Sequence, residues 1–182
     1  MKVLTAADFG VSSWLGGTTT QLYIFPESAT LGERNFDWRI SSAVVETAVS
    51  EFSSFEGYER ILIPLEGNLE MEHQTENGVL EQSVGTFELA RFSGSWKTTG
   101  KGKLTDFNLI FKPSYTPVVS VHHFNAGEHI PFEREITAVY LHQGVLEYAG
   151  KRLEAPVLIL NEERTDWECS VSETARLILI RM

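Results

Sequence analysis

Cysteine is almost absent from this sequence of 182 residues, with Cys169 as the single example. One cysteine cannot form an intramolecular disulfide, which is consistent with the reducing conditions of the cytoplasm. Residues 167–171 alternate between apolar and polar side chains as in a strand, and no adjacent basic residue favours the thiolate. We therefore expect Cys169 to be a structural residue and not a nucleophile.

Basic residues are outnumbered and scattered along the chain. There are 15 Lys and Arg residues against 25 Asp and Glu residues, which gives a formal net charge of −10. Nucleic-acid binding requires a clustered excess of lysine and arginine, so we expect no nucleic-acid partner. The acidic balance favours solubility instead.

Long apolar runs are missing as well. No segment approaches the ~18 apolar residues of a transmembrane helix. The first eight residues also lack the apolar centre of a secretory signal peptide. We therefore expect a soluble, cytoplasmic protein that has no membrane partner.

Helical periodicity is nearly absent, whereas short strand-like segments recur along the whole chain. Residues 22–25, 61–65 and 105–111 are rich in β-branched and aromatic residues and end at turn-forming residues. Residues 41–50 are ambiguous, but their valines favour a strand. Many short strands separated by Gly, Asn and Pro are typical of an all-β sandwich or small barrel.

Two segments of the chain resemble each other. Residues 61–70 and 138–147 both read as a strand, a polar turn that contains glycine, and a second strand. In the later segment the turn is expected at Gln143-Gly144. The pattern predicts two related β-barrel halves, residues 1–115 and 116–182, folded together as one compact unit.

Motifs for metal, cofactor and nucleophilic chemistry are missing too. A metal site in a barrel needs two histidines one residue apart on a strand, so that both face inward. The adjacent pair His122 and His123 would face opposite ways on a strand. The chain also lacks a Gly-x-Ser-x-Gly elbow, a dinucleotide-binding loop and a Walker loop. We therefore expect neither a metal nor a cofactor.

What the chain does have is an arginine within a strongly patterned strand. In residues 36–43 the large apolar residues lie on one face, and Arg39 and Ser41 lie on the other. Arg60 comes just ahead of the next apolar strand. A buried arginine needs a polar partner or a pocket. Two such arginines on adjacent strands predict a site for a small anion, with a structural salt bridge as the alternative.

Asp106 and Asn108 share one face of a later strand, opposite Phe107 and Leu109. As a structural pair they would brace an arginine through charge-assisted hydrogen bonds. As a functional pair they would complete a polar pocket in which arginine binds carboxylate, because the planar guanidinium suits bidentate recognition. Four aromatic residues are available as apolar walls or as core: Trp14, Trp38, Phe52 and Phe55.

Together these segments resemble the HutD/Ves family of double-cupin-like proteins, and the resemblance covers residues 14–111. The matching motifs, in chain order, are Trp14 with Gly17-x-Thr19-x-Gln21, Phe36-x-Trp38-Arg39-x-Ser41-x-Ala43, Phe52-Ser53-x-Phe55-x-Gly57-x-x-Arg60, Leu65-Glu66-Gly67 and Asp106-Phe107-Asn108-Leu109. The remaining half matches only in its barrel-like pattern.

The resemblance implies a cupin-like (RmlC-like jelly roll) β-barrel with two lobes, a bicupin, and no cupin metal ligands. It also implies a link to histidine utilisation, for which binding of an intermediate such as formylglutamate has been proposed; other members are linked to stress or temperature responses. This chain departs from the family pattern between Trp14 and Gly17, where the segment is short and lacks the usual asparagine. Gln21 also replaces the usual glutamate. Both changes lie in the expected pocket, so the ligand of other family members cannot be assigned to this chain on the resemblance alone.

Our leading hypothesis is a metal-independent protein that binds a small carboxylate and has a regulatory or sensing role. In it two arginines bind the anion, four residues supply neutral hydrogen bonds, Asp106 orients an arginine, and two aromatic residues form walls. The full set is Trp14, Thr19, Gln21, Arg39, Ser41, Phe55, Arg60, Asp106 and Asn108.

Two alternatives stay open. One is an isomerase, lyase or hydrolase of a small acid with Asp106 as general base, which requires a carboxylate that is not held in an ion pair. The other is an interaction protein whose strand edges pair with a partner or with a second copy in a homodimer. We expect binding rather than catalysis.

Overall fold

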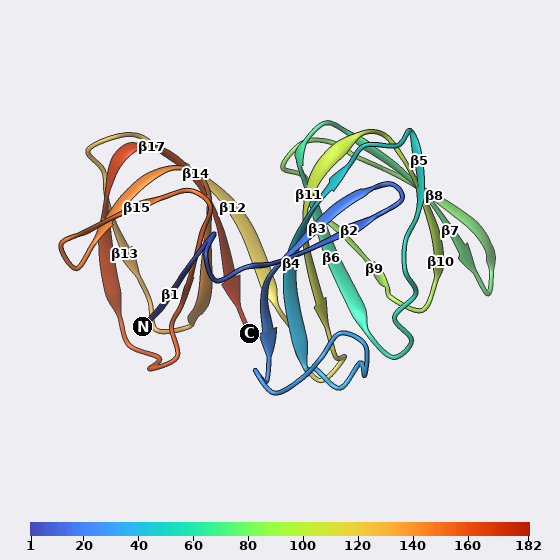
Figure 1. The fold of residues 1–182 in the computed structure, drawn as a ribbon, viewed down its shortest axis with the longest axis horizontal. Coiled ribbons are helices and arrows are strands. Elements are labelled where there is room, and N and C mark those ends of the chain that lie inside the picture. Colours follow the sequence, from blue (N-terminus) through green and yellow to red (C-terminus); the bar gives the residue numbers. More distant parts are fainter. The chain divides into compact units, whose positions relative to one another are not determined.

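The computed structural model describes all residues from 1 to 182, and it confirms the prediction of an all-β protein. The backbone forms two compact units (Figure 1). One unit consists of residues 9–114, and the other of residues 1–8 and 115–182. No helix long and apolar enough to cross a membrane occurs in the chain.

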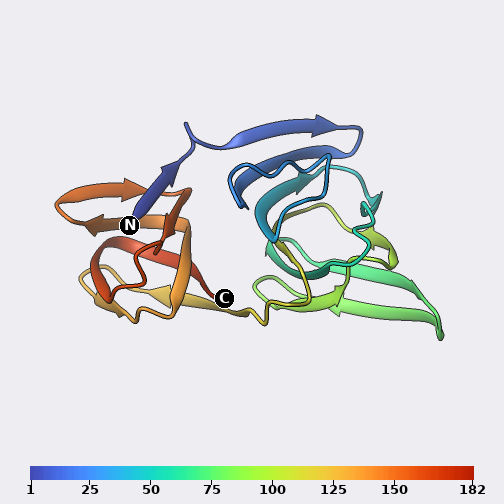
Figure 2. The same ribbon diagram turned by 90° about the horizontal axis from the view of Figure 1, so that it is seen from below.

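The unit of residues 9–114 contains a six-stranded sheet in the order β2-β3-β4-β11-β6-β9 and a four-stranded sheet in the order β5-β10-β7-β8. Strands β7 and β8 form a long hairpin that projects from this unit in both views (Figures 1 and 2). The strand bounds are β2 (Gly10–Trp14), β3 (Gly17–Phe25), β4 (Trp38–Val45), β5 (Val49–Glu51), β6 (Glu59–Glu66), β7 (Leu69–Thr75), β8 (Gly78–Val84), β9 (Ala90–Ser93), β10 (Lys97–Lys101) and β11 (Leu104–Phe111).

The two sheets pack their inner faces together. Leu62 and Leu104 of the six-stranded sheet and Leu69 and Met71 of the four-stranded sheet belong to one buried apolar cluster. The sheets are open and not closed into the expected barrel, because β2, β9, β5 and β8 remain as edges. In this unit the cupin-like fold therefore consists of two sheets that face each other.

The register of β4, β11 and β6 determines which side chains meet on the inner face. Arg39 pairs with Ile110, which pairs on its other side with Arg60. The two arginines therefore flank the central strand β11, two strand spacings or roughly 10 Å apart. In the next row Ser41 lies beside Asn108. Three strands that are distant in sequence thus place their polar residues on one surface.

The other unit is built on one seven-stranded sheet, with the order β1-β16-β14-β17-β12 and with β13 and β15 attached at β17 and β14. Residues 1–8 belong here because β1 pairs with β16. The strand bounds are β1 (Lys2–Thr5), β12 (Val118–Phe124), β13 (His129–Phe132), β14 (Ile136–Tyr148), β15 (Lys151–Glu154), β16 (Val157–Leu160) and β17 (Trp167–Arg181).

Cys169 lies in the apolar core of this unit, on β17. It is buried, and burial raises the pKa of its thiol to about 12. The thiolate, which is the nucleophilic form, is therefore suppressed. These properties agree with a structural cysteine.

The turn predicted at Gln143-Gly144 is wrong. Strand β14 runs without a break from Ile136 to Tyr148, and its pairing with β17 shifts register near Gln143. Gly144 has φ of +91°, and a Cβ added there would lie 2.3 Å from the carbonyl oxygen of Thr174. A glycine that tolerates positive φ suits a bulge as well as a turn, so the sequence pattern did not distinguish the two.

Candidate functional site

A cavity of about 310 Å³ lies on the inner face of the six-stranded sheet, and its size suits a small molecule. Eight of the nine residues predicted for the ligand site line it: Trp14, Thr19, Arg39, Ser41, Phe55, Arg60, Asp106 and Asn108. The ninth, Gln21, contacts the cavity indirectly, through Arg39.

Arg39 is buried and held by neutral partners. Its Nε donates to Oε1 of Gln21 at 2.8 Å, and its Nη1 donates to Oγ of Ser41 at 3.0 Å. Burial lowers its pKa to about 10, so the guanidinium stays charged at neutral pH. Because a guanidinium has five N–H donors and these bonds use two, the side chain can bind a further acceptor. Gln21 therefore orients Arg39 without neutralising its charge.

Arg60 is enclosed by aromatic rings. Its guanidinium carbon lies 5.1 Å from the ring centre of Phe52, 5.8 Å from that of Phe55 and 5.2 Å from that of Phe92. One weak hydrogen bond runs from Nη1 to the carbonyl oxygen of Ser53 at 3.3 Å, and Nε has no partner. Burial lowers the pKa of Arg60 to about 10; the charge of nearby Asp106 acts in the opposite direction. This arginine is held in place mainly by its contacts with the rings.

Asp106 does not brace either arginine through a hydrogen bond. It is 3% exposed and lines the cavity, yet its Oδ1 has no hydrogen-bond partner. Burial raises the pKa of Asp106 to about 7, against the lowering effects of the Arg60 charge and the backbone N–H of Ala43. We expected Asp106 to orient an arginine. In the structure it acts on Arg60 only through its charge, without a hydrogen bond.

Asn108 and Thr19 complete the polar lining. Asn108 is 8% exposed, and its Oδ1 also lacks a partner. Thr19 lies on β3 beside Ala43 of β4, in the row next to Ser41. The buried part of the cavity surface therefore combines two positive charges with several neutral groups and one carboxyl, that of Asp106, which titrates near neutral pH.

The apolar walls come from two different elements. Phe55 is buried in the loop before β6, and Trp14 lies at the end of β2 with 41% of its surface exposed. A Cβ added at Gly16 would lie 2.0 Å from Cζ3 of Trp14, so the ring packs directly on the glycine backbone. The absence of a side chain at Gly16 therefore lets the Trp14 ring take its place in the wall of the cavity.

Some residues of the site were not anticipated from the sequence. Phe92 reaches Arg60 because β9 pairs with β6 and places the two residues opposite each other. Ser53 contributes only its backbone carbonyl. Neither contact has a sequence signature, since one depends on strand pairing and the other does not use the side chain. Glu51 also lines the cavity, with a side chain that is 73% exposed.

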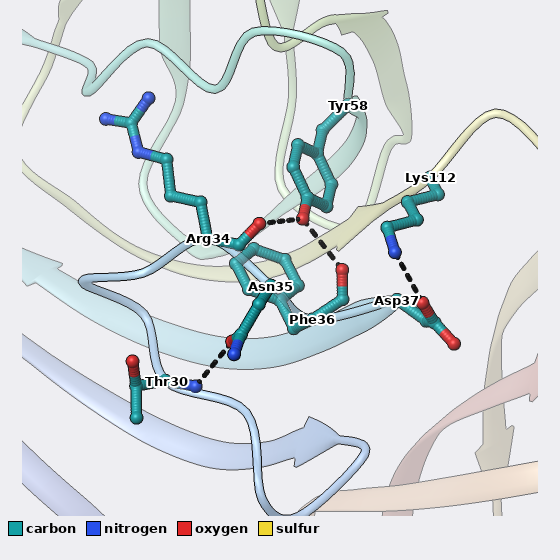
Figure 3. Close-up of polar contacts among 7 residues, drawn as sticks. All are labelled: Thr30, Arg34, Asn35, Phe36, Asp37, Tyr58 and Lys112. Carbon is teal, nitrogen blue, oxygen red and sulfur yellow. Dashed lines mark hydrogen bonds and ion pairs between the residues drawn. The ribbon is translucent and has the colours of Figure 1, made fainter.

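The loop that leads into β4 is anchored by Tyr58 (Figure 3). The Tyr58 hydroxyl lies 2.7 Å from the carbonyl oxygens of both Arg34 and Phe36, which share its hydrogen. Beyond the loop, Asp37 accepts a 2.7 Å hydrogen bond from Lys112, in an ion pair that ties the start of β4 to the end of β11. These contacts fix the backbone just ahead of Arg39.

Tyr58→Phe is expected to lower the free energy of unfolding by about 1–2 kcal/mol, because it leaves the buried carbonyl of Phe36 without its donor. Urea unfolding measures the change. The matched control is Tyr23→Phe, whose hydroxyl bonds to exposed Glu27 and should matter by less than about 0.5 kcal/mol. Equal effects of the two substitutions would contradict the anchoring role.

The other unit has a cavity of its own, of about 890 Å³, lined mainly by aromatic and aliphatic side chains such as Phe124, Phe132 and Trp167. At its rim Arg181 is paired with Glu133 at 3.2 Å. This cavity therefore offers no second pair of buried arginines. No group of three or more His, Cys, Asp or Glu side chains in the chain is arranged to hold a metal ion.

Comparison with known sequences identifies one family and one relative. The family model described as HutD matches residues 6–179. An uncharacterised 21.2 kDa protein of Pseudomonas putida, from the 3′ region of hutC, is 32% identical over 119 residues. That alignment covers 62% of this chain and 59% of the relative, so it spans about three fifths of the relative's length.

Solved structures share the fold. A conserved protein of unknown function from Pseudomonas aeruginosa has a TM-score of 0.79 at 21% identity, covering 99% of this chain and 97% of its own. HutD from Pseudomonas fluorescens has a TM-score of 0.68 at 20% identity, with the same coverage. The bacterial pirin YhhW of Escherichia coli, solved with nickel(II), has a TM-score of 0.70 at 10% identity, covering 100% and 98%. The last of these is a cupin-type protein, which confirms the predicted cupin-like fold.

Proposed function

The chain belongs to the HutD family, and from this premise we propose that it binds a small carboxylate in the cavity between Arg39 and Arg60. The observation that carries the proposal is the pair of buried guanidinium groups that line one cavity and have no ion-pair partner. Leaving two buried charges unpaired is costly, and an anionic ligand would offset this cost. A planar carboxylate matches the donor geometry of arginine.

The size and lining of the cavity narrow the ligand class. A volume of about 310 Å³ accommodates a small organic acid and is at the lower end of ligand pockets. Trp14 and Phe55 offer apolar surface to a short carbon chain, while Ser41, Thr19 and Asn108 offer neutral hydrogen-bonding groups. A dicarboxylate such as N-formylglutamate has this combination of features, and the family's link to histidine utilisation supports it as the first compound to test.

The proposed role is regulatory or metabolic sensing, with the ligand as the sensed compound. A thermal-shift screen of N-formyl-L-glutamate, L-glutamate and glutarate tests it. A compound present at about a hundred times its Kd is expected to raise Tm by about 5–10 °C. Glutaramide, which has the shape of glutarate without its charges, is the matched control and should have no effect. Equal shifts for glutarate and glutaramide would contradict an anion site.

A second function is favoured by the state of Asp106. A carboxyl with no hydrogen-bond partner at Oδ1 and a pKa of about 7 fulfils the conditions for a general base at neutral pH. In this function Asp106 removes the proton from the carbon next to the bound carboxylate. Incubation with N-formyl-L-glutamate in D₂O would then exchange the α-proton, as seen by NMR, in the wild type but not in Asp106→Asn. Binding without exchange would leave the sensing role alone.

A further inference from the structure

The two arginines of the cavity share it with a single buried carboxyl. Asp106 lies on β11, the strand between the strands that carry Arg39 and Arg60. No ion pair joins Asp106 to either guanidinium, and its Oδ1 is unpartnered although the residue is 97% covered. The carboxyl is contacted by the backbone N–H of Ala43 but by no side chain, and its Oδ1 is unpaired in the cavity that both guanidinium groups line.

An incoming carboxylate changes the electrostatic balance at Asp106. Without a ligand, the charges of Arg39 and Arg60 favour the ionised form of Asp106. A ligand carboxylate between the arginines offsets these charges and adds a like charge. At about 6 Å and an effective dielectric constant of about 20, that like charge alone favours the protonated form roughly a hundredfold. Asp106 is thus a stronger proton acceptor in the complex.

None of the other charged groups around Asp106 can take up a proton in its place when a carboxylate binds. Arg39 of β4 and Arg60 of β6 remain protonated, since their pKa values are about 10. His73 of β7 faces Arg60; burial and the arginine lower its pKa below 6.5, so it stays neutral above that pH. Glu51 of β5 is exposed and lies within 3.8 Å of Lys97 of β10. Strand β3 contributes only uncharged side chains to the cavity.

From this arrangement we propose that a carboxylate binds in the cavity together with one proton, which Asp106 takes up. The inference rests on the proposed carboxylate-binding function. Protonation also resolves a conflict among hydrogen-bonding groups, because Oδ1 of Asp106 and Oδ1 of Asn108 are both unpartnered acceptors on the same face of β11. The protonated carboxyl becomes a donor, available to Asn108 or to the ligand. Where the protonated carboxyl donates to the ligand, it favours ligands that present an acceptor beside their carboxylate.

Calorimetric titration of the full chain with N-formyl-L-glutamate and with glutarate at pH 8, in HEPES and in Tris, measures the number of protons taken up. Both compounds keep their carboxyl groups ionised at this pH, so they contribute no protons. We expect close to one proton per bound molecule at pH 8 and much less at pH 6, where Asp106 already holds it. Affinity should fall up to tenfold per pH unit above pH 7.

Asp106→Asn imitates the protonated carboxyl and is expected to bind with no proton uptake and with an affinity independent of pH between 6.5 and 8.5. Glu81→Gln, an exposed position on β8 of the same unit and outside the cavity, should retain the uptake of the wild type. Binding by the wild type at pH 8 with the same heat in both buffers, after correction for dilution, would overturn the inference while leaving carboxylate binding intact. Absence of binding at every pH would overturn both. The wild-type titrations decide the question even if Asp106→Asn does not fold.

Discussion

Arg60→Met is expected to weaken the binding of N-formyl-L-glutamate by about thirtyfold to several thousandfold, equivalent to about 2–5 kcal/mol. Methionine retains most of the apolar stem that packs among Phe52, Phe55 and Phe92 but removes the charge. The loss is large because Arg60 is 5% exposed, so the attraction of its guanidinium for an anion is little screened by water. Calorimetry at pH 6.5, where Asp106 is mostly protonated, measures the effect most cleanly.

Arg91 provides a matched control for this prediction. Its guanidinium carbon lies 5.2 Å from the ring centre of Phe111, as that of Arg60 does from Phe92, but Arg91 is exposed and outside the cavity. Arg91→Met should therefore leave the affinity within about twofold of the wild type. The assignment of the arginines would be wrong if Arg60→Met and Arg39→Met both bound the ligand as well as Arg91→Met does.

The second large effect is a stability that depends on pH through Asp106. Its pKa is raised from 3.8 to about 7 in the folded chain, so the folded state binds the proton more tightly than the unfolded state. The resulting stabilisation is full below pH 4 and is lost as the pH rises through 7. Three pH units correspond to about 4 kcal/mol as an upper value. We expect the wild type to lose about 2–4 kcal/mol of stability from this group between pH 4 and pH 8.

Asp106→Asn removes this dependence, because asparagine is neutral at every pH. Urea unfolding of the wild type and the variant at pH 5, 6, 7 and 8 should give curves that diverge in favour of the variant as the pH rises. Glu81→Gln, an exposed substitution on β8 outside the cavity, should remain parallel to the wild type. Asp166, whose pKa is lowered by hydrogen bonds from Arg134, acts below pH 4 and does not interfere. Parallel curves for Asp106→Asn would show that Asp106 is ionised throughout this range.

Much of the fold and the membership of the site could be predicted from the sequence, because both follow from local alternation. The period of two in residues 36–43 and 105–111 placed Arg39 and Ser41 on one face and Asp106 and Asn108 on another, and the strands β4 and β11 bear this out. The two faces form one surface only because β4 pairs in register with β11, a strand about sixty residues later in the sequence. The family resemblance, rather than the alternation, indicated that they meet.

The contacts within the site could not be predicted. A carboxylate and an amide near two arginines permit several hydrogen-bonded pairs. From the sequence we expected Asp106 to hold one of the arginines in place. The structure instead gives Arg39 the neutral Gln21 and surrounds Arg60 with rings. Whether a buried acid pairs with an arginine depends on differences of an ångström or two in the backbone, which no residue pattern records. The same limit explains the misread turn at Gly144, where positive φ suited both a turn and a bulge.

The most direct test of the account is a crystal structure of the full chain with N-formyl-L-glutamate bound at pH 6.5. We predict that carboxylate oxygens of the ligand lie within about 3 Å of guanidinium nitrogens of both Arg39 and Arg60. Asp106 or Asn108 should contact the same molecule. A ligand found in the cavity of the other unit, beside Phe132 and Trp167, or one in this cavity that touches neither arginine, would contradict the central claim.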